Sequence, residues 1–338
     1  EKAQSLLEAA IKESDRLRMP LAQIRTHLLI ASIANEQNDR PKVHKHLLEM
    51  FKLAKLFGLH LFCGWVPGHL ISWACHYALN EGIETEFVHN YVTRLIPWLA
   101  SPNETVNAWP WPIRIYTLGT FKVVLGSGKI LGKSKKEHRP LEILQMLVIH
   151  SGEINTSELM QTLYPKLSDE KQSSTLRKHL HQLRIMLGHE LAIIRDGCFL
   201  KLNQRLCWLD ADAFEVLLKD QSNASLKQAL TLYQGIYLPN VDKESFEITM
   251  RREQLRGSYL RAVLDHLQGL EGEQAIRQCL DALHIEPLSE VLYQTLMSLY
   301  RDSGRMDLAR ATYEQCRRIL RTELGVEPMI ESQRLAGF

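Results

Sequence analysis

Long apolar stretches are missing from this chain of 338 residues. No run approaches the roughly 20 apolar residues that a membrane-spanning helix requires, and no secretory signal opens the chain. The apolar content of 45% and the charged content of 24% are ordinary for a globular protein. These features exclude a membrane-spanning protein and favour a cytoplasmic one with two or three domains, each with its own core.

Cysteine is scarce, and its positions indicate no metal site. None of the six cysteines belongs to a CxxC pair, and no cluster of Cys and His has zinc-ligand spacing. We therefore expect reduced and mostly buried thiols, as in a cytosol, and neither a metal nor a cofactor. The cysteines are Cys63, Cys75, Cys198, Cys207, Cys279 and Cys316, and the scattered histidines of the first segment are His27, His44, His46 and His60.

The net charge is only +2, but positive charge is concentrated in the middle of the chain. Residues 113–209 carry 15 Lys and Arg against eight Asp and Glu, an excess of about +7, which leaves about −5 for the flanking segments together. A basic domain between neutral or acidic neighbours favours a local contact with a polyanion.

A basic amphipathic segment, from Ser173 to Leu187, lies within this excess. Leucines at spacings of four, three and four predict a helix with one apolar face: Leu176, Leu180, Leu183 and Leu187. Its other face carries hydroxyls and cations, which suit phosphate oxygens and base edges. Between Leu191 and Asn203, the turn Arg195-Asp196-Gly197 predicts a hairpin with a cation at its tip. The helix and the hairpin together predict an element that binds DNA and recognises its sequence. The alternative is a solvated helix beside an unrelated hairpin.

Helical periodicity runs from Glu1 to about Leu99 and predicts antiparallel helix pairs, each stacked on the next. The segment Trp109-Pro110-Trp111-Pro112 ends these helices because neither proline fits a helix interior, and we interpret it as a linker. The expected domains are therefore a helical-repeat sensor segment at 1–108, a central domain at 113–209 and a second helical domain at 210–338.

The central segment has the element order of a winged helix-turn-helix. Residues 113–125 alternate as strands do, and Gly126-Ser127-Gly128 predicts a turn. Helices are expected at Arg139–Ile149 and Glu158–Leu163. A polar loop, Tyr164–Lys171, then precedes the basic helix and the hairpin.

The last segment, from Asp210 to Phe338, repeats every 34 residues, which is the period of tetratricopeptide helix pairs. Gly304 falls in an expected turn between two helices, and Pro287 at the end of a repeat. The matched pairs are Tyr259 with Tyr293, Ala262 with Leu296, Ala275 with Ala309, and Ala282 with Cys316.

Residues 113 to about 335 resemble the bacterial transcriptional activators of the Streptomyces antibiotic regulatory protein type. The resemblance implies an OmpR-type winged helix-turn-helix domain followed by a bacterial transcriptional activation domain. The expected fold is therefore mainly α, with tetratricopeptide-like helical repeats on both sides of the winged helix. The matching stretches are LGTF at Leu118–Phe121, RPLEILQMLVIHSGEI at Arg139–Ile154, the helix with Leu176-Arg177-Lys178, and YEQCRRILRTELGVEP at Tyr313–Pro328.

The N-terminal third is similar to the helical sensor repeats of maltose-regulator-type signal-transduction ATPases. Because the chain begins with Glu1 rather than Met, we expect a fragment or a processed product. The similarity implies an ATPase module upstream, whereas this chain itself is expected not to be an enzyme. It also implies that the N-terminal repeats bind a signal ligand or a partner protein.

The predicted function is that of a sequence-specific DNA-binding activator in the bacterial cytoplasm, associated with the nucleoid. We expect the helix Ser173–Leu187 to enter the major groove of double-stranded DNA, with the hairpin beside it. The expected DNA contacts are Ser173, Ser174, Thr175, Arg177, Lys178, His181, Arg184, Arg195 and Lys201.

The resemblance also implies two protein partners. In related winged-helix activators the loop before the recognition helix faces RNA polymerase, and a plain solvated loop is the alternative here. Family members bind direct repeats, so a homodimer with two protomers side by side is expected. The residues expected to contact the polymerase are Lys166, Asp169, Glu170 and Lys171.

Two departures from the family pattern leave the operator sequence open. Cys198 stands directly after the wing glycine, where the family usually has an aromatic residue, and Phe199 follows it. Tyr164-Pro165 replaces the usual Trp at the end of the second helix.

Two other interpretations compete with DNA binding. The stretch Gly126–Ser134 looks like a phosphate-binding loop, but its spacing is one residue too long from Gly126 and one too short from Gly128. A helical-repeat scaffold for partner proteins would explain the first and last segments. It would not explain the strands, the hairpin or the charge excess of the middle segment.

Overall fold

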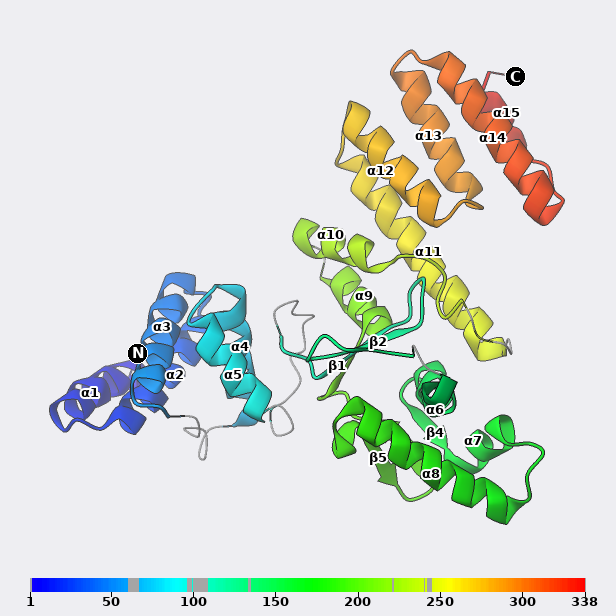
Figure 1. Cartoon of the computed structure of the whole chain (residues 1–338). Coiled ribbons are helices and arrows are strands. Elements are labelled where there is room, and N and C mark those ends of the chain that lie inside the picture. The colour runs from blue at the N-terminus through cyan, green and yellow to red at the C-terminus, as the bar shows by residue number, and fades with distance from the viewer. Residues whose placement is uncertain are drawn as a thin grey trace. The chain divides into compact units, whose positions relative to one another are not determined.

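The computed structural model describes residues 2–59, 67–95, 99, 109–132, 135–220, 222–239, 241 and 245–337 (Figure 1). The chain forms two compact units: residues 1–115 with 123–208, and residues 116–122 with 209–338. The predictions that involve His60, Cys63, Lys133 or Ser134 fall outside the described residues.

In the described residues of the first part of unit 1, the chain forms five helices (Figure 1). Helix α2 begins at Pro20 and α3 has Pro41 in its first turn, where the amide hydrogen that proline lacks would have no helical partner. The Asp39 carboxylate caps α3 by accepting from the Lys42 amide at 3.1 Å. Helices α2 and α3 pack closely around fully buried side chains such as Phe51. The helices are α1 (Lys2–Arg16), α2 (Pro20–Glu36), α3 (Arg40–Leu56), α4 (Gly68–Asn80) and α5 (Thr85–Leu95).

A histidine pair joins α2 to α3. The Nδ1 atoms of His27 and His46 lie 2.9 Å apart, so one ring donates and the other accepts. The accepting ring must be neutral at Nδ1. Burial lowers the pKa of His27, and the nearby carboxylates of Glu49 and Asp15 only partly offset this effect. The pair is therefore a packed contact between two helices.

Acidification from about pH 7 to about pH 5 is expected to destabilise these helices. The pKa of His27 lies below its ordinary value of 6.5 in the folded state. The unfolded chain therefore takes up protons first as the pH falls through that value, and the free energy of unfolding decreases. Thermal unfolding of the full chain at both pH values should show a smaller pH effect for His27→Gln. The exposed His89→Gln variant should show the same pH effect on thermal unfolding as the wild type. Equal pH effects in all three proteins would show that His27 does not cause the loss of stability in acid.

In the described residues, the rest of unit 1 contains two sheets and three α-helices, and some of its strands end in unit 2. The first sheet has the strand order β3-β2-β1-β7, and the second, antiparallel sheet has the order β4-β6-β5. These elements have the order of a winged helix-turn-helix, with β5 and β6 as the wing, as the sequence predicts. They are β1 (Ile113–Tyr116), β2 (Lys122–Leu125), β3 (Ile130–Leu131), α6 (Lys135–Ile149), β4 (Glu153–Asn155), α7 (Thr156–Leu163), α8 (Asp169–Leu187), β5 (Ile193–Asp196), β6 (Phe199–Leu202) and β7 (Cys207–Leu209).

All three helices begin earlier than the sequence predicts. Helix α6 starts at Lys135 rather than at Arg139, because the chain remains helical on the N-terminal side of Pro140. Helix α7 starts at Thr156, directly after the capping side chain of Asn155. Helix α8 starts at Asp169 rather than at Ser173, so the expected loop Tyr164–Lys171 is shorter. Two acidic residues in the first turn of α8 favour this earlier start, because the helix dipole stabilises negative charge there.

The tryptophan-proline segment is packed rather than exposed. The side chains of Trp109 and Trp111 are 1% and 7% exposed. The Arg114 guanidinium donates to the Trp109 carbonyl at 3.1 Å, and the Gly126 amide donates to the Pro112 carbonyl at 2.7 Å. Gly126 and Gly128 of the stretch that resembles a phosphate-binding loop lie in the turn between β2 and β3, in which the Leu125 amide donates to the Lys129 carbonyl at 2.9 Å.

From Asp210 onward, all the named elements of unit 2 are helices in the part of the chain that the structure describes. All eight side chains that the 34-residue period pairs are at most 4% exposed, so the repeat in the sequence corresponds to a repeat in the core. Gly304 turns between α13 and α14 with a φ of 74°. The helices are α9 (Asp210–Lys219), α10 (Asn223–Leu232), α11 (Phe246–Gln268), α12 (Gly272–Ile285), α13 (Glu290–Asp302), α14 (Met306–Leu324) and α15 (Ile330–Leu335).

A buried carboxylate anchors segment 116–122 to the start of α9 within unit 2. The Asp210 side chain is 1% exposed and accepts from the amides of Thr117 and Leu118 at 2.8 and 2.9 Å, and from the Thr117 hydroxyl at 2.6 Å. Gly119 follows with a φ of +91°, and a Cβ at this position would lie 2.7 Å from the Gln234 carbonyl oxygen. The fold therefore requires glycine at this position of the LGTF stretch.

A second buried carboxylate, Glu286, joins the helices of unit 2. It accepts from the Tyr233 hydroxyl at 2.7 Å and from the Arg256 Nε at 2.9 Å. The Tyr233 ring stacks on that of Tyr259 with centroids 4.2 Å apart. Burial raises the pKa of Tyr233, which keeps its hydroxyl protonated and able to donate.

The described cysteines are mostly buried, and none of them is in a disulfide. Burial raises the pKa of both Cys279 and Cys316 to about 12, so these thiols stay protonated. Cys198, at the tip of the wing, is exposed. In the described part of the chain, no helix has the length and apolar character needed to cross a membrane.

Candidate nucleic-acid interface

Helix α8 is fixed by its apolar face. The four leucines of the predicted stripe are between 0% and 7% exposed. Gly188 ends the helix in the left-handed conformation with a φ of 75°, and its amide donates to the Arg184 and Ile185 carbonyls. Because one face is held by the core, the opposite face presents its side chains in a set arrangement.

The exposed face of α8 brings together most of the predicted DNA contacts. Ser174, Arg177, Lys178 and His181 are exposed, whereas Ser173, Thr175 and Arg184 are half-buried. The earlier start of α8 places the two serines and Thr175 in the second turn, where backbone amides already have helical partners. Only their hydroxyls therefore remain for phosphate contacts, and the Ser174 hydroxyl donates to the Lys171 carbonyl at 3.0 Å.

Arg184 joins α8 to the wing. Its Nε and Nη2 atoms donate to the Ile193 carbonyl oxygen at 3.2 and 2.7 Å. Ile193 is the first residue of β5, so this guanidinium holds the edge strand of the wing against the last turns of α8. This role could not be predicted from the sequence, because the acceptor is a backbone carbonyl, which every residue has.

The wing is a tight hairpin anchored to α7. Gly197 has a φ of 59° in the two-residue turn, which a residue with a side chain adopts only with strain. The Cys198 carbonyl accepts from both the amide and the hydroxyl of Thr156, at 2.8 and 2.9 Å. The wing tip is therefore held against the start of the second helix of the domain.

The two predicted wing cations lie on opposite faces of the hairpin. Arg195 pairs with the buried Leu200 across the strands and lies two residues after the buried Ile193, on the same face of β5. It therefore lies on the core-facing side, where it is exposed near the tip. Lys201 lies on the outer side, 3.3 Å from Glu153 and 3.0 Å from Asp196. Hydrogen bonds to these two carboxylates raise the pKa of Lys201.

The short connection between α7 and α8 is held by side chains that sequence reasoning missed. The Gln172 amide is buried and donates to the carbonyls of Tyr164 and Leu167 at 3.0 and 3.1 Å. The Tyr164 hydroxyl lies 2.8 Å from the Nδ1 of His179. Burial raises the pKa of Tyr164 to about 12 and lowers that of His179. This tyrosine replaces the tryptophan of the family pattern, and its hydroxyl ties the end of α7 to α8.

The residues predicted to meet the polymerase surround this connection. Lys166 is exposed in the connection itself. Asp169, Glu170 and Lys171 are also exposed, but they form the first turn of α8 rather than a loop.

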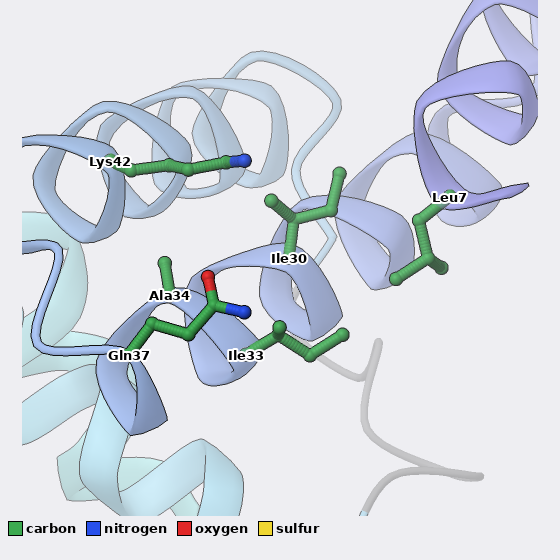
Figure 2. A pocket seen from close by; sticks show the side chains of 6 residues that line it. All are labelled: Leu7, Ile30, Ile33, Ala34, Gln37 and Lys42. Atoms are coloured by element: carbon green, nitrogen blue, oxygen red, sulfur yellow. The ribbon is translucent and has the colours of Figure 1, made fainter. Parts of the chain in front are cut away.

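Other described parts of the chain offer few binding features. No group of three or more His, Cys, Asp or Glu in the described ranges is placed to hold a metal ion. A hollow among α1, α2 and α3, lined by Leu7, Ile30 and Lys42 among others, has no room for a water molecule (Figure 2). A larger hollow of about 470 Å³ lies beside α3 and the turn before α5, where Lys55 and Glu84 form an ion pair at 2.6 Å.

The chain shows the following similarities to known proteins. The family model of the bacterial transcriptional activator domain matches residues 211–337. The regulatory protein AfsR of Streptomyces griseus is 27% identical over 241 residues, which cover 66% of this chain and 24% of AfsR. The chain therefore spans about a quarter of the length of this relative. The structure of Mycobacterium tuberculosis EmbR in complex with a low-affinity phosphopeptide has 16% sequence identity and a TM-score of 0.45, and the match covers 67% of this chain and 64% of EmbR.

Proposed function

Because this chain belongs to the Streptomyces antibiotic regulatory protein family of transcriptional activators, we propose that it reads operator DNA with α8 in the major groove. The observation that carries the proposal is the exposed cationic face of α8, which its buried leucines hold in place next to the wing. A helix of this kind fits the major groove, and an adjacent hairpin reaches the neighbouring backbone or minor groove.

The proposed contacts divide by chemistry. The contacts of Arg177, Lys178 and His181 are divided between base edges and phosphates. The hydroxyls of Ser173 and Thr175 donate to phosphates, and that of Ser174 does so when it releases the Lys171 carbonyl. Arg195 reaches the backbone or minor groove from the wing. Arg184 and Lys201 add positive charge to the interface, while their bonds within the protein hold the wing in place.

We further propose that the DNA-bound protein contacts RNA polymerase through Lys166, Asp169, Glu170 and Lys171. Their exposure around the connection before α8 supports this contact. The buried Gln172 supports it too, because its two hydrogen bonds present the connection in one conformation.

Reversing the charge of both lysines, Lys166→Glu with Lys171→Glu, is expected to abolish activation in run-off transcription with bacterial RNA polymerase. Operator occupancy at saturating protein should remain complete, because neither residue belongs to the proposed DNA-contacting set. The matched control Lys219→Glu with Lys227→Glu makes the same charge change elsewhere and should activate normally. Normal activation by the first double variant would remove the polymerase contact, and failure of the wild type to activate would refute the function itself.

The remaining proposed partners concern the flanking helices. Two protomers would bind side by side on direct repeats in the operator. Helices α1–α5 would bind a signal ligand or a partner protein that regulates activation. The tetratricopeptide-like pairing of α11 to α14 supports a bracing role for unit 2, because stacked helix pairs make an extended and stable surface.

A further inference from the structure

The outermost line of side chains on α8 ends in an apolar residue. With about 3.6 residues per turn, side chains at spacings of four, three and four lie along one edge of a helix. The edge opposite the buried leucines carries Ser174, Lys178, His181 and Ile185. Ile185 is 65% exposed, the same as Met329 and more than most large apolar side chains of the chain.

The surroundings of Ile185 distinguish it from an incidental surface residue. A single exposed isoleucine needs no explanation by itself. Isoleucine, however, favours a helix less than lysine, arginine or glutamine does, so this position gains no helical stability from it. Lys178 and His181 precede it on the same edge, and Arg177 lies on the flank. Any polyanion that these cations attract is brought into contact with Ile185 as well, and this charge favours DNA over an apolar protein partner.

We infer that Ile185 recognises thymine by packing against its 5-methyl group in the major groove. This specificity rests on the proposed function of α8. Thymine is distinguished in the major groove by its methyl group, which apolar side chains recognise, whereas arginine and lysine pair with guanine or phosphate. Arg184 supports the placement, because its bonds to the Ile193 carbonyl hold the last turns of α8 beside the wing.

The position of the thymine follows from the length of the helix. Ile185 lies eight residues after Arg177, which corresponds to about 12 Å along an α-helix. Successive bases of a strand are about 3.4 Å apart. For a helix that follows the groove, the thymine therefore lies about three or four base pairs from the base that Arg177 reads, on the side of the wing.

Replacing thymine by deoxyuridine removes the methyl group and leaves the pairing edge intact. An operator is first selected from random-sequence DNA with the full chain, and each thymine is then replaced in turn. At one thymine the wild type should bind about fourfold more weakly, as expected for the loss of one buried methyl contact. Ile185→Ala should bind the thymine and deoxyuridine operators equally at that position. Ile185→Val, which retains part of the apolar surface, should show an intermediate ratio.

The matched control is Ile194→Ala on the outer side of the wing. Ile194 is 42% exposed and alternates with the buried Ile193, so the same side-chain truncation is made away from α8. This variant should keep the wild-type sensitivity to deoxyuridine. Circular dichroism and thermal unfolding identify any variant that fails to fold. If Ile185→Ala does not fold, the comparison of the wild type with Ile185→Val on the thymine and deoxyuridine operators tests the inference.

The outcomes separate thymine recognition from DNA binding. If the wild type selects an operator but no deoxyuridine substitution weakens binding, the inference is overturned and the proposed function stands. If Ile185→Ala keeps the full sensitivity of the wild type, another residue reads the methyl group and the inference is again overturned. If Ile185→Ala loses only the cooperative occupancy of adjacent sites, Ile185 contacts protein instead. If no operator is selected, the proposed function fails, and the inference fails with it.

Discussion

Replacing Asp210 by alanine is expected to lower the free energy of unfolding of unit 2 by about 3 kcal/mol, because each buried donor left without an acceptor costs about 1–3 kcal/mol. The substitution removes the acceptor of the Thr117 and Leu118 amides. These residues are 0% and 3% exposed, so water does not readily replace the carboxylate. Segment 116–122 should then detach from the start of α9 before the tetratricopeptide-like helices unfold.

Chemical denaturation of the full chain, followed by hydrogen exchange at the Thr117 and Leu118 amides, measures this effect. Asp212→Ala is the matched control. Its carboxylate side chain is 59% exposed and lies 3.7 Å from Arg251, and an exposed ion pair is typically worth about 0–1 kcal/mol. Asp210→Asn keeps one acceptor oxygen and should fall between the two. If Asp210→Ala and Asp212→Ala unfold alike, the buried carboxylate is not the anchor.

Replacing Arg177 by alanine is expected to weaken operator binding by about 1–3 kcal/mol, or roughly five- to 150-fold, and to relax specificity at one base pair. Arg177 is exposed on the cationic face of α8, and its Nε atom has only a long bond of 3.4 Å to the Ser173 carbonyl within the helix. A guanidinium in this position is able to pair with a guanine edge through two hydrogen bonds. The loss should therefore be largest on the selected operator and small on unrelated DNA.

Substitutions of two further arginines distinguish the loss of base-specific recognition from the loss of one positive charge. Arg205→Ala removes the same charge from an exposed turn of the same domain and should leave the preferred sequence unchanged. Arg184→Ala releases the wing from α8 and should weaken binding to all sequences alike, with higher protease sensitivity of the hairpin. If Arg177→Ala and Arg184→Ala both leave operator affinity unchanged, α8 is not the recognition helix.

The parts of the fold that depend on local patterns could be predicted from the sequence. The leucine spacing identified the buried face of α8, and the Arg195-Asp196-Gly197 turn identified the wing, because each pattern acts within a few residues. The 34-residue period likewise identified the repeated core positions, since the same packing recurs in each helix pair.

The missed features depend on contacts between distant segments. Asp210 is the first residue of α9, where the helix dipole favours an acid, but its partner Thr117 lies 93 residues away. The tie between Tyr164 and His179 is visible only once α7 and α8 are packed together. The start of α8 was missed for a different reason. Asp169, Glu170 and Lys171 are all exposed, so no apolar spacing marks that turn as helical.

DNA recognition by α8 is tested most directly by selection from random-sequence DNA, followed by measurement of operator affinity at two salt concentrations. The wild type should enrich one motif. Its affinity should fall on the order of a hundredfold between about 50 and 200 mM salt if four phosphates are neutralised. Arg177→Ala should enrich a less defined motif under the same conditions. No enrichment and no binding at low salt would contradict DNA recognition and would favour a helical-repeat scaffold for partner proteins.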